Sequence, residues 1–398
     1  MKRRKFDIVP LGELLEGTPR NGFSPVCPGL PTGKWVLGLS ALDGRGLDLS
    51  EAKPVPANDP LVDKFMLRPG DFLISRSNTL DKVGRVGVFR GELENCSYPD
   101  LMMRFRSDRE KVHPLYLETY LKGDKAIKFI RQHATGTSGS MKTINQSTVE
   151  SIPIVVPSIS EQESIATILL SWYESIQKTE KLTAAKERHY THELSRLISR
   201  GQHPHAHVST FAEEVSARNR GGNEARVLSV TNSRGFVLPE DQFERRVASA
   251  DLSNYKVVRR WQYAYNPSRI NVGSIARLEG WDDGVLSPMY VVFRINEEKV
   301  RSDYFLHWLN SHEARQRIKN SAQGSVRETV SFSEFAAITI PLPEIHTQTA
   351  IASYLNALRE EIDLLGQSIA ALKTQKRGLM QKLLTGEWRL PINDRASE

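Results

Sequence analysis

The sequence predicts an α+β protein in which two repeated domains of mixed helix and strand are separated by a long antiparallel two-helix coiled coil. Three observations support this fold class. A thirteen-residue segment occurs twice, the residues upstream of both copies also match, and a long helical pattern without proline follows each copy. With 398 residues and 39% hydrophobic content, the chain is long enough for two or three domains.

The repeated segment reads PSISEQESIATIL at 157–169 and PEIHTQTAIASYL at 343–355, and six of the thirteen positions are identical. A proline followed by Ser160-x-x-Glu163 predicts a helix N-terminus with a capping box. The second copy has His346 and Thr347 in place of Ser160 and Glu161, which weakens this capping pattern. One copy would be an ordinary helix start, but two copies 186 residues apart indicate a duplication.

The duplication extends upstream, where residues 104–136 align with 292–324 at a constant offset of 188. Both segments change from alternating residues to helical spacing, which predicts a strand, a turn and a helix. Two pairs of shorter, strand-like runs also match: 35–44 with 226–235, and 82–89 with 271–278. The predicted organisation is a first domain at 1–157, a helix at 158–200, a second domain at 201–343, a helix at 344–386 and a tail at 387–398.

Apolar residues follow a heptad pattern in both helical segments, regular in the second and less regular in the first. This spacing favours a partner helix over packing on a globular core. The simplest partner for each helix is the other, in an antiparallel pair of roughly 57 Å with one domain at each end. The predicted seam consists of Ile165, Leu169, Trp172, Ile176, Ile351, Leu355, Leu358, Ile362, Leu365, Ile369, Leu372, Leu379 and Leu383.

The charge, the apolar runs and the cysteines of the sequence favour some classes of protein and exclude others. The formal net charge of +7 is compatible with a polyanionic partner. We expect a cytoplasmic protein with no membrane association, because no apolar run approaches a membrane span and the N-terminal residues lack the apolar stretch of a signal peptide. Cys27 and Cys96 are too few for a disulfide framework and lack the spacing of a zinc site.

No motif predicts catalysis, and we expect no cofactor and no metal. An adenine methyltransferase would need a glycine-rich cofactor loop and an Asn/Asp-Pro-Pro-aromatic element, and the nearest match, residues 266–269, is more typical of a turn. The chain has no Walker loop. His203 and His205 lie in a short connection, where two histidines rarely bind metal. Residues 51–53 resemble the end of an acidic nuclease motif, but no convincing partner acid precedes them.

The sequence resembles the specificity subunits of Type I restriction-modification systems from about Val9 to Leu390. The resemblance rests on the two repeated helix starts, GDFLISRSN and YAYNPSRIN inside the domains, and LLTGEWRL after the second helix. It implies two target recognition domains, each reading one half of a bipartite sequence in double-stranded DNA. It also implies a coiled coil that docks two methyltransferase (modification) subunits, and restriction/translocase subunits as further partners. In that family the partner subunits carry out catalysis, with S-adenosylmethionine and ATP.

Candidate DNA-binding residues are chosen by chemistry, because Lys and Arg neutralise phosphates while Arg, Asn and Gln read base edges. Such residues gather in corresponding loops of the two domains but differ between the copies, as two modules reading different half-sites would require. Glycine-rich loops beside a cation form a second candidate surface. The candidates are Arg76, Asn78, Lys82, Arg85 and Lys142 in the first domain, and Asn266, Arg269, Asn271, Arg277 and Arg327 in the second.

The leading interpretation is therefore a non-enzymatic DNA-reading subunit. Two alternatives from other classes stay open. One is a coiled-coil scaffold with two globular protein-binding domains. The other is a restriction enzyme chain whose catalytic residues are not recognisable in the sequence.

Overall fold

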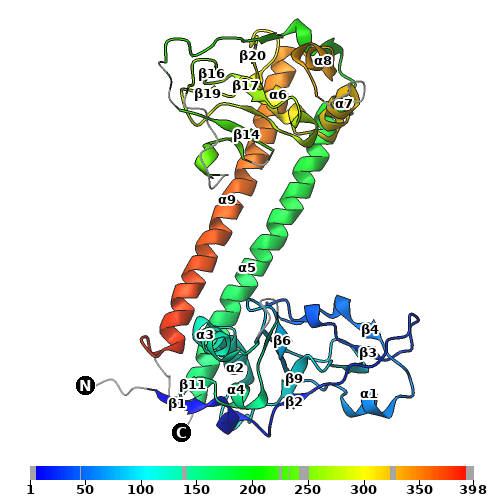
Figure 1. Cartoon of the computed structure of the whole chain (residues 1–398), viewed down its shortest axis with the longest axis vertical. Coiled ribbons are helices and arrows are strands. Elements are labelled where there is room, and N and C mark those ends of the chain that lie inside the picture. The colour runs from blue at the N-terminus through cyan, green and yellow to red at the C-terminus, as the bar shows by residue number, and fades with distance from the viewer. Residues whose placement is uncertain are drawn as a thin grey trace. The chain divides into compact units, whose positions relative to one another are not determined.

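The computed structural model describes residues 6–44, 46–136, 141–222, 224, 226–232, 234–241, 251–322 and 329–390. The chain divides into two compact units, Met1–Lys178 with Ile369–Glu398, and Thr179–Ser368. Two long helices, α5 (Ile159–Leu194) and α9 (Ile345–Leu384), each contribute to both units (Figure 1).

The globular parts of the two units contain the remaining helices and strands, most of them short. In the first unit these are β1 (Asp7–Pro10), β2 (Arg20–Asn21), β3 (Trp35–Val36), β4 (Lys53–Pro54), α1 (Pro60–Lys64), β5 (Phe72–Ser75), β6 (Ser77–Asn78), β7 (Val86–Val88), β8 (Cys96–Ser97), β9 (Met102–Phe105), α2 (Pro114–Leu121), α3 (Asp124–His133), β10 (Lys142–Thr143), α4 (Gln146–Glu150) and β11 (Pro153–Val156). In the second unit they are β12 (His205–His207), β13 (Ala212–Glu214), β14 (Ser229–Thr231), β15 (Gly235–Val237), β16 (Lys256–Arg259), β17 (Tyr263–Tyr265), β18 (Ile275–Arg277), β19 (Asp283–Leu286), β20 (Val291–Ile295), α6 (Ser302–Leu309), α7 (His312–Ala322), α8 (Phe332–Ala336) and β21 (Thr339–Pro341).

The two globules share one topology. Each has a four-stranded antiparallel sheet, in the order β2-β9-β5-β7 in the first unit and β13-β20-β17-β18 in the second. Three short helices follow each sheet, and a strand pair, β1 with β11 or β12 with β21, leads into the long helix. Gly84 and Gly273 occupy equivalent left-handed positions, at φ 77° and 94°, just before the last strand of each sheet. The predicted α+β fold with two pseudo-repeated domains is confirmed.

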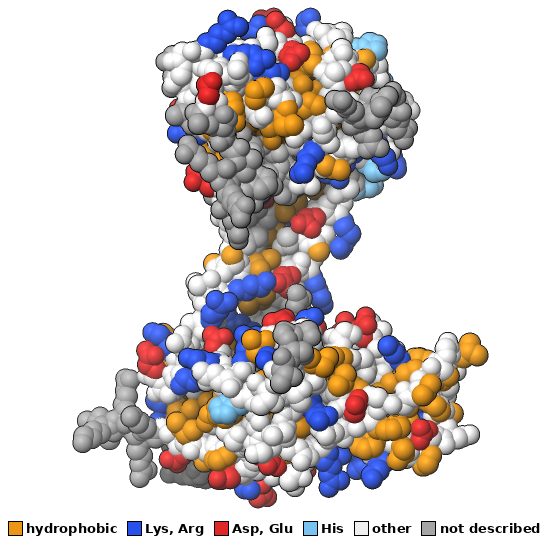
Figure 2. Space-filling model, viewed as in Figure 1, with side chains coloured by type: hydrophobic (Ala, Val, Ile, Leu, Met, Phe, Trp, Pro, Cys, Tyr) orange, Lys and Arg blue, Asp and Glu red, His pale blue; other side chains and the backbone are white. Residues whose placement is uncertain are grey.

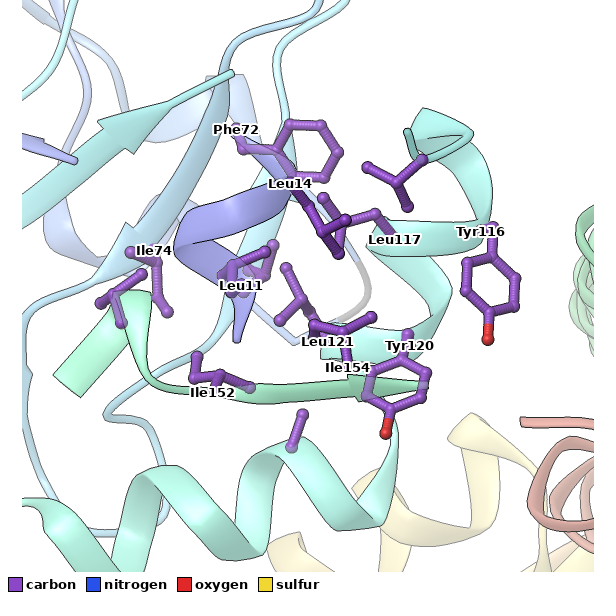
Figure 3. Packing of buried hydrophobic residues seen from close by; sticks show 14 of the residues in the cluster. Leu11, Leu14, Phe72, Ile74, Tyr116, Leu117, Tyr120, Leu121, Ile152 and Ile154 are labelled. Atoms are coloured by element: carbon purple, nitrogen blue, oxygen red, sulfur yellow. The ribbon is translucent and has the colours of Figure 1, made fainter. Parts of the chain in front are cut away.

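The first core packs α2 against the sheet and against the strand before α5. Figure 3 shows Tyr116, Leu117, Tyr120 and Leu121 of α2 near Ile154 of β11. The hydroxyl of Tyr116 donates to the Val155 carbonyl at 2.7 Å, so the buried ring keeps its polar atom satisfied. In the second unit the equivalent tyrosine of α6 makes the same type of bond to the Pro341 carbonyl at 2.9 Å.

The ends of the long helices belong to the globular cores. In the first unit Ile165 and Leu169, from the start of α5, lie in one apolar cluster with Leu383, from the end of α9. In the second unit Leu194, from the end of α5, shares a cluster with Leu355, from the start of α9. The start of one helix thus packs with the end of the other in each unit, which is the antiparallel arrangement. All thirteen predicted seam residues are buried or half-buried.

The predicted capping box at Ser160 and Glu163 is wrong. Helix α5 begins at Ile159, so Ser160 already lies inside the helix. The Ser158 side chain accepts a hydrogen bond from the Glu161 amide at 3.4 Å, and the Ser158 carbonyl accepts from the Gln162 amide. Because the proline starts the helix earlier than the pattern suggested, the changes at His346 and Thr347 do not fall on a cap.

The glutamine repeated in both helix starts has a structural role that no sequence motif indicates. Gln162 is fully buried. Its Oε1 accepts from the His113 amide at 2.8 Å, and its Nε2 donates to the Pro157 carbonyl at 2.9 Å. Gln348 makes the same pair of bonds to the Arg301 amide at 2.8 Å and the Pro343 carbonyl at 2.7 Å. This glutamine fastens the start of each long helix to the loop before α2 or α6.

Candidate nucleic-acid interface

In the first unit, the structure brings two of the predicted DNA-binding residues together. Strands β6 and β10 pair antiparallel, with Asn78 opposite Lys142. The Lys142 ammonium donates to the Gly136 carbonyl at 2.9 Å, which holds it at the start of the glycine-rich loop. Lys82 lies in the exposed turn between β6 and β7. Asn78 and Lys142 thus place an amide beside a cation, and Lys82 adds a cation on the turn that follows β6; this is chemistry suited to a base edge and a phosphate.

Two predicted arginines of the first unit are engaged with its own backbone. The Arg76 guanidinium donates to the Asp100 carbonyl at 3.3 Å. Arg85 donates to the Asp43 carbonyl at 3.0 Å and lies 3.8 Å from the Asp81 carboxylate. Both side chains therefore support neighbouring loops. A contact with DNA would have to use their remaining N–H groups.

In the second unit, the turn between β17 and β18 presents three predicted residues. The Asn266 side chain accepts from the Ser268 amide at 3.0 Å, which fixes the turn, and the Arg269 side chain is exposed. Both residues line a pocket of about 380 Å³, together with Asn232 and Met289. The Asn271 side-chain carbonyl oxygen is buried and has no hydrogen-bond partner in the part of the chain that the structure describes. The structure thus gathers Asn266 and Arg269 at one opening.

The side chain of the predicted residue Arg277 is held by its own domain. Its side chain is only 8% exposed, and its guanidinium pairs with the Glu279 and Asp303 carboxylates at 2.6 Å each. It also lies over the Trp261 ring, 5.2 Å from the ring centroid. The alignment with 82–89 placed this position in a strand, but it could not show that two carboxylates neutralise the arginine. Arg327 falls outside the described residues.

A chain of hydrogen bonds links this arginine to both long helices. The Asp303 carboxylate pairs with Arg277 and also accepts a hydrogen bond from the Asn356 side-chain amide at 2.9 Å. The Asn356 side-chain carbonyl is 2.8 Å from His307 Nε2, and His307 Nδ1 is 2.9 Å from the Tyr190 hydroxyl. The five residues come from β18, α6, α9 and α5, so the four-stranded sheet of the second unit is tied to both long helices by hydrogen bonds and an ion pair. No sequence motif marks this network.

Burial lowers the pKa of His307 below its ordinary value, because the charged imidazolium is poorly solvated there. The folded state then binds this proton less readily than the unfolded state. The stability contributed by neutral His307 is complete above about pH 6.5 and is lost as the pH falls below it. We expect the unfolding midpoint to drop more steeply from pH 7.5 to pH 5.5 in the wild type than in His307→Gln. His205→Gln, at an exposed site, should keep the wild-type slope, and an unchanged slope in His307→Gln would contradict the assignment.

The described residues show neither a metal centre nor a membrane segment. Within them, no cluster of three or more His, Cys, Asp or Glu side chains is arranged to hold a metal ion. His203 Nε2 lies 2.8 Å from the Leu197 carbonyl and helps close the connection after α5. None of the described helices has the length and apolar character needed to cross a membrane.

Comparison with known proteins identifies the family. The model of the Type I restriction modification DNA specificity domain matches residues 60–186 and 282–374, more than half of the chain. A chain named as the putative type I restriction enzyme MjaX specificity subunit of Methanocaldococcus jannaschii is 22% identical over 97% of this chain and 94% of its own length. The type I restriction enzyme EcoKI specificity subunit of Escherichia coli K12 is 24% identical over 60% of this chain and 49% of its own length.

Solved structures show the same fold. The Type-I restriction-modification system S subunit from M. genitalium is 13% identical, with a TM-score of 0.58, and the match covers 96% of this chain and 97% of that one. A chain solved in work on complex assembly and conformational transition of the type I R-M system is 14% identical, also with a TM-score of 0.58, over 96% and 98%. The resemblance inferred from the repeated motifs is confirmed, and the chain belongs to the Type I restriction-modification DNA specificity family.

Proposed function

We propose that this chain is the specificity subunit of a Type I restriction-modification complex and reads a bipartite sequence in double-stranded DNA. The observation that carries the proposal is the repeated sheet whose equivalent turns present different polar side chains. The turn before β7 offers Lys82, and the turn before β18 offers Asn271 at the aligned position, with Arg269 beside it. A shared scaffold with different side chains at one place is what two readers of different half-sites need.

The domain limits of this proposal are those predicted from the sequence, with recognition domains at 1–157 and 201–343 and helices at 158–200 and 344–386. The proposed readers are Asn78, Lys82 and Lys142 in the first domain and Asn266, Arg269 and Asn271 in the second. Arg76 and Arg85 stay in the proposal as supports of the first loop that keep some N–H groups for phosphates.

The proposed partners are two methyltransferase subunits, which dock on the paired helices, and restriction subunits that join them. Two matching units, in each of which the start of one long helix packs with the end of the other, offer two equivalent sets of contacts, as a pseudo-symmetric assembly requires. In this proposal the chain supplies sequence choice and its partners supply catalysis. It acts in the cytoplasm, where the DNA lies.

Methylome sequencing of cells that carry this gene with its partner genes tests the function. We expect methylated adenines in a single motif made of two specified halves with a fixed unspecified gap. Loss of the gene should remove that motif and leave other methylation unchanged. A continuous motif, or methylation that is unaffected by loss of the gene, would overturn the proposal.

We expect Arg269→Ala to weaken binding to a duplex that carries the methylated motif by about 2 kcal/mol, roughly thirtyfold, because alanine cannot make a bidentate hydrogen bond with a base. Discrimination at one base pair of the second half-site should relax as well. Arg294→Ala, which removes an exposed arginine of the same domain paired with Glu213, is the control and should bind like wild type. Competition binding with single-base-pair variants of the duplex measures both effects.

If Arg269→Ala keeps both the affinity and the base preference of the wild type, Arg269 is not a reader. If the affinity falls equally for all duplexes while the base preference is kept, Arg269 contacts a phosphate.

A further inference from the structure

A cationic cleft lies in the first unit, where the turn between α2 and α3 meets the last part of α9. It encloses about 360 Å³. Figure 2 shows Lys and Arg side chains gathered over this part of α9. Five of its lining residues are cations and one is an acid: Lys122, Lys125, Lys373, Lys376, Arg377 and Asp124. None of these residues was a candidate from the sequence, because they come from segments about 250 positions apart.

Lys376 shows how strongly positive the cleft is. The side chain is half-buried, and its ammonium lies 5.0 Å from the centroid of the Tyr173 ring. Burial lowers the pKa of Lys376, and the neighbouring charge of Lys122 lowers it further. Among the described residues no carboxylate is ion-paired with Lys376, whereas Lys122 pairs with Glu118 at 2.7 Å. An anion entering the cleft would relieve this repulsion.

The second unit contains the equivalent cleft and serves as an internal control. There the turn between α6 and α7 meets the end of α5, enclosing about 990 Å³. The offsets of 186 and 188 residues align the five cationic positions of the first cleft with residues of a different character. Lys122, Lys125, Lys373, Lys376 and Arg377 align, in this order, with Asn310, Glu313, Glu187, Tyr190 and Thr191. The second cleft has its own cations at other positions, Arg200, Arg315, Arg317 and Arg359. The same architecture thus forms without cations at these five positions, so the fold does not require them there.

One contact of the first cleft does have a structural counterpart. Lys376 over Tyr173 corresponds to Arg359 over Tyr190, which lies 5.6 Å from the ring centroid. The cation comes from α9 and the ring from α5 in both pairs, although Lys376 aligns with Tyr190 and Tyr173 with Arg359. This pair joins α5 to α9 in both units. The remaining cations have no such counterpart. Lys125 and Arg377 are exposed.

The N-terminus of α3 also favours an anion. Gly123 precedes this ten-residue helix and provides no side-chain cap for its first turn. In the second unit the aligned residue is Ser311, whose hydroxyl accepts from the Ala314 amide at 3.1 Å. A serine side chain thus caps the first turn of α7 in the second unit. The first turn of α3 in the first unit has no such cap, and its residues line the cationic cleft.

We propose that this cleft binds a backbone phosphate of double-stranded DNA, independently of base sequence. The inference rests on the proposed function, since it assigns a further contact to the DNA that the two domains read. A phosphate fits the combination of exposed cations and an uncapped helix start. Lys125 and Arg377 would make the contact, and Lys376 would add its charge from the floor of the cleft.

The test compares two double variants of the full chain that each remove two positive charges. Lys125→Gln with Arg377→Gln alters the cleft. Lys128→Gln with Lys178→Gln is the control, since these exposed lysines lie outside it on α3 and α5. Fluorescence anisotropy measures binding to a random-sequence duplex over a series of salt concentrations. The cleft variant should show an affinity about tenfold lower at fixed salt, and a log–log salt slope shallower by about 0.9 for each phosphate that it no longer neutralises.

The outcomes separate the cleft from the proposed function. A wild-type chain that binds no duplex, alone or with its methyltransferase subunits, overturns the proposed function and the cleft together. If the wild type binds DNA and the two variants have equal affinities and equal salt slopes, the proposed phosphate site in the cleft is overturned but the proposed function is not. A cleft variant that keeps DNA binding but no longer co-purifies with its methyltransferase subunits also overturns it, because the cations would then face an acidic protein surface. Matching thermal melts show that both variants are folded.

Discussion

Arg389→Ala is expected to destabilise the first unit by about 3 kcal/mol, because it leaves a buried carboxylate without its partner. Arg389 pairs with Glu161 through two hydrogen bonds of 2.7 Å, and the Glu161 side chain is 0% exposed while that of Arg389 is 37% exposed. The guanidinium also lies over the Phe6 ring, 4.1 Å from its centroid. Urea unfolding followed by tryptophan fluorescence measures the change in stability, and Trp388 adjoins the altered residue.

The double variant Glu161→Gln with Arg389→Ala isolates the cause. Replacing the orphaned carboxylate by a neutral amide should recover a large part of the lost stability, because the buried group is then no longer an unpaired charge. The matched control is Arg109→Ala, an exposed arginine of the same unit. If the double variant is as unstable as Arg389→Ala, packing on Phe6 rather than charge accounts for the effect.

Gln162→Leu is expected to cost a similar amount, about 3 kcal/mol, since the His113 amide and the Pro157 carbonyl would both be left without a buried hydrogen-bond partner. Leucine removes the polar atoms but fills a comparable volume, so the effect reports on the hydrogen bonds rather than on a cavity. The equivalent change Gln348→Leu should destabilise the second unit by a comparable amount, because the bonds are equivalent.

Gln132→Leu is the control for this change. It makes the same substitution on the exposed face of α3 and should alter stability by less than about 0.5 kcal/mol. If Gln162→Leu behaves like Gln132→Leu, the repeated glutamine is not the fastening that its geometry indicates.

The repeat predicted the fold well because core residues and topology are duplicated together. The match of 104–136 with 292–324 corresponds to β9-α2-α3 and β20-α6-α7, and the heptad pattern corresponds to buried and half-buried positions of two antiparallel helices. The predicted capping box at Ser160 was wrong because two serines lie two positions apart, and it is Ser158 that caps the helix. Local patterns fix the presence of an element better than its ends.

The side chains of the site were harder to predict than the fold. Arg277 had the residue type and the loop of a reader, but Glu279 and Asp303 neutralise it, and Asp303 lies on another element. The cationic cleft was not predictable for the opposite reason. Lys125 and Arg377 meet only because the end of α9 returns to the first unit. Contacts between distant segments determine such sites, and single-residue chemistry does not reveal them.

The return of α9 to the first unit also affects how the protein is made. Leu383 and Leu384 are 0% and 6% exposed within the apolar cluster that contains Leu11 and Phe72, so residues synthesised late complete the core begun by residues synthesised early. While the ribosome still holds the final turns of α9, that cluster has an open apolar face. The N-terminal half must therefore stay soluble until α9 has been translated, which makes chaperone protection of that half valuable.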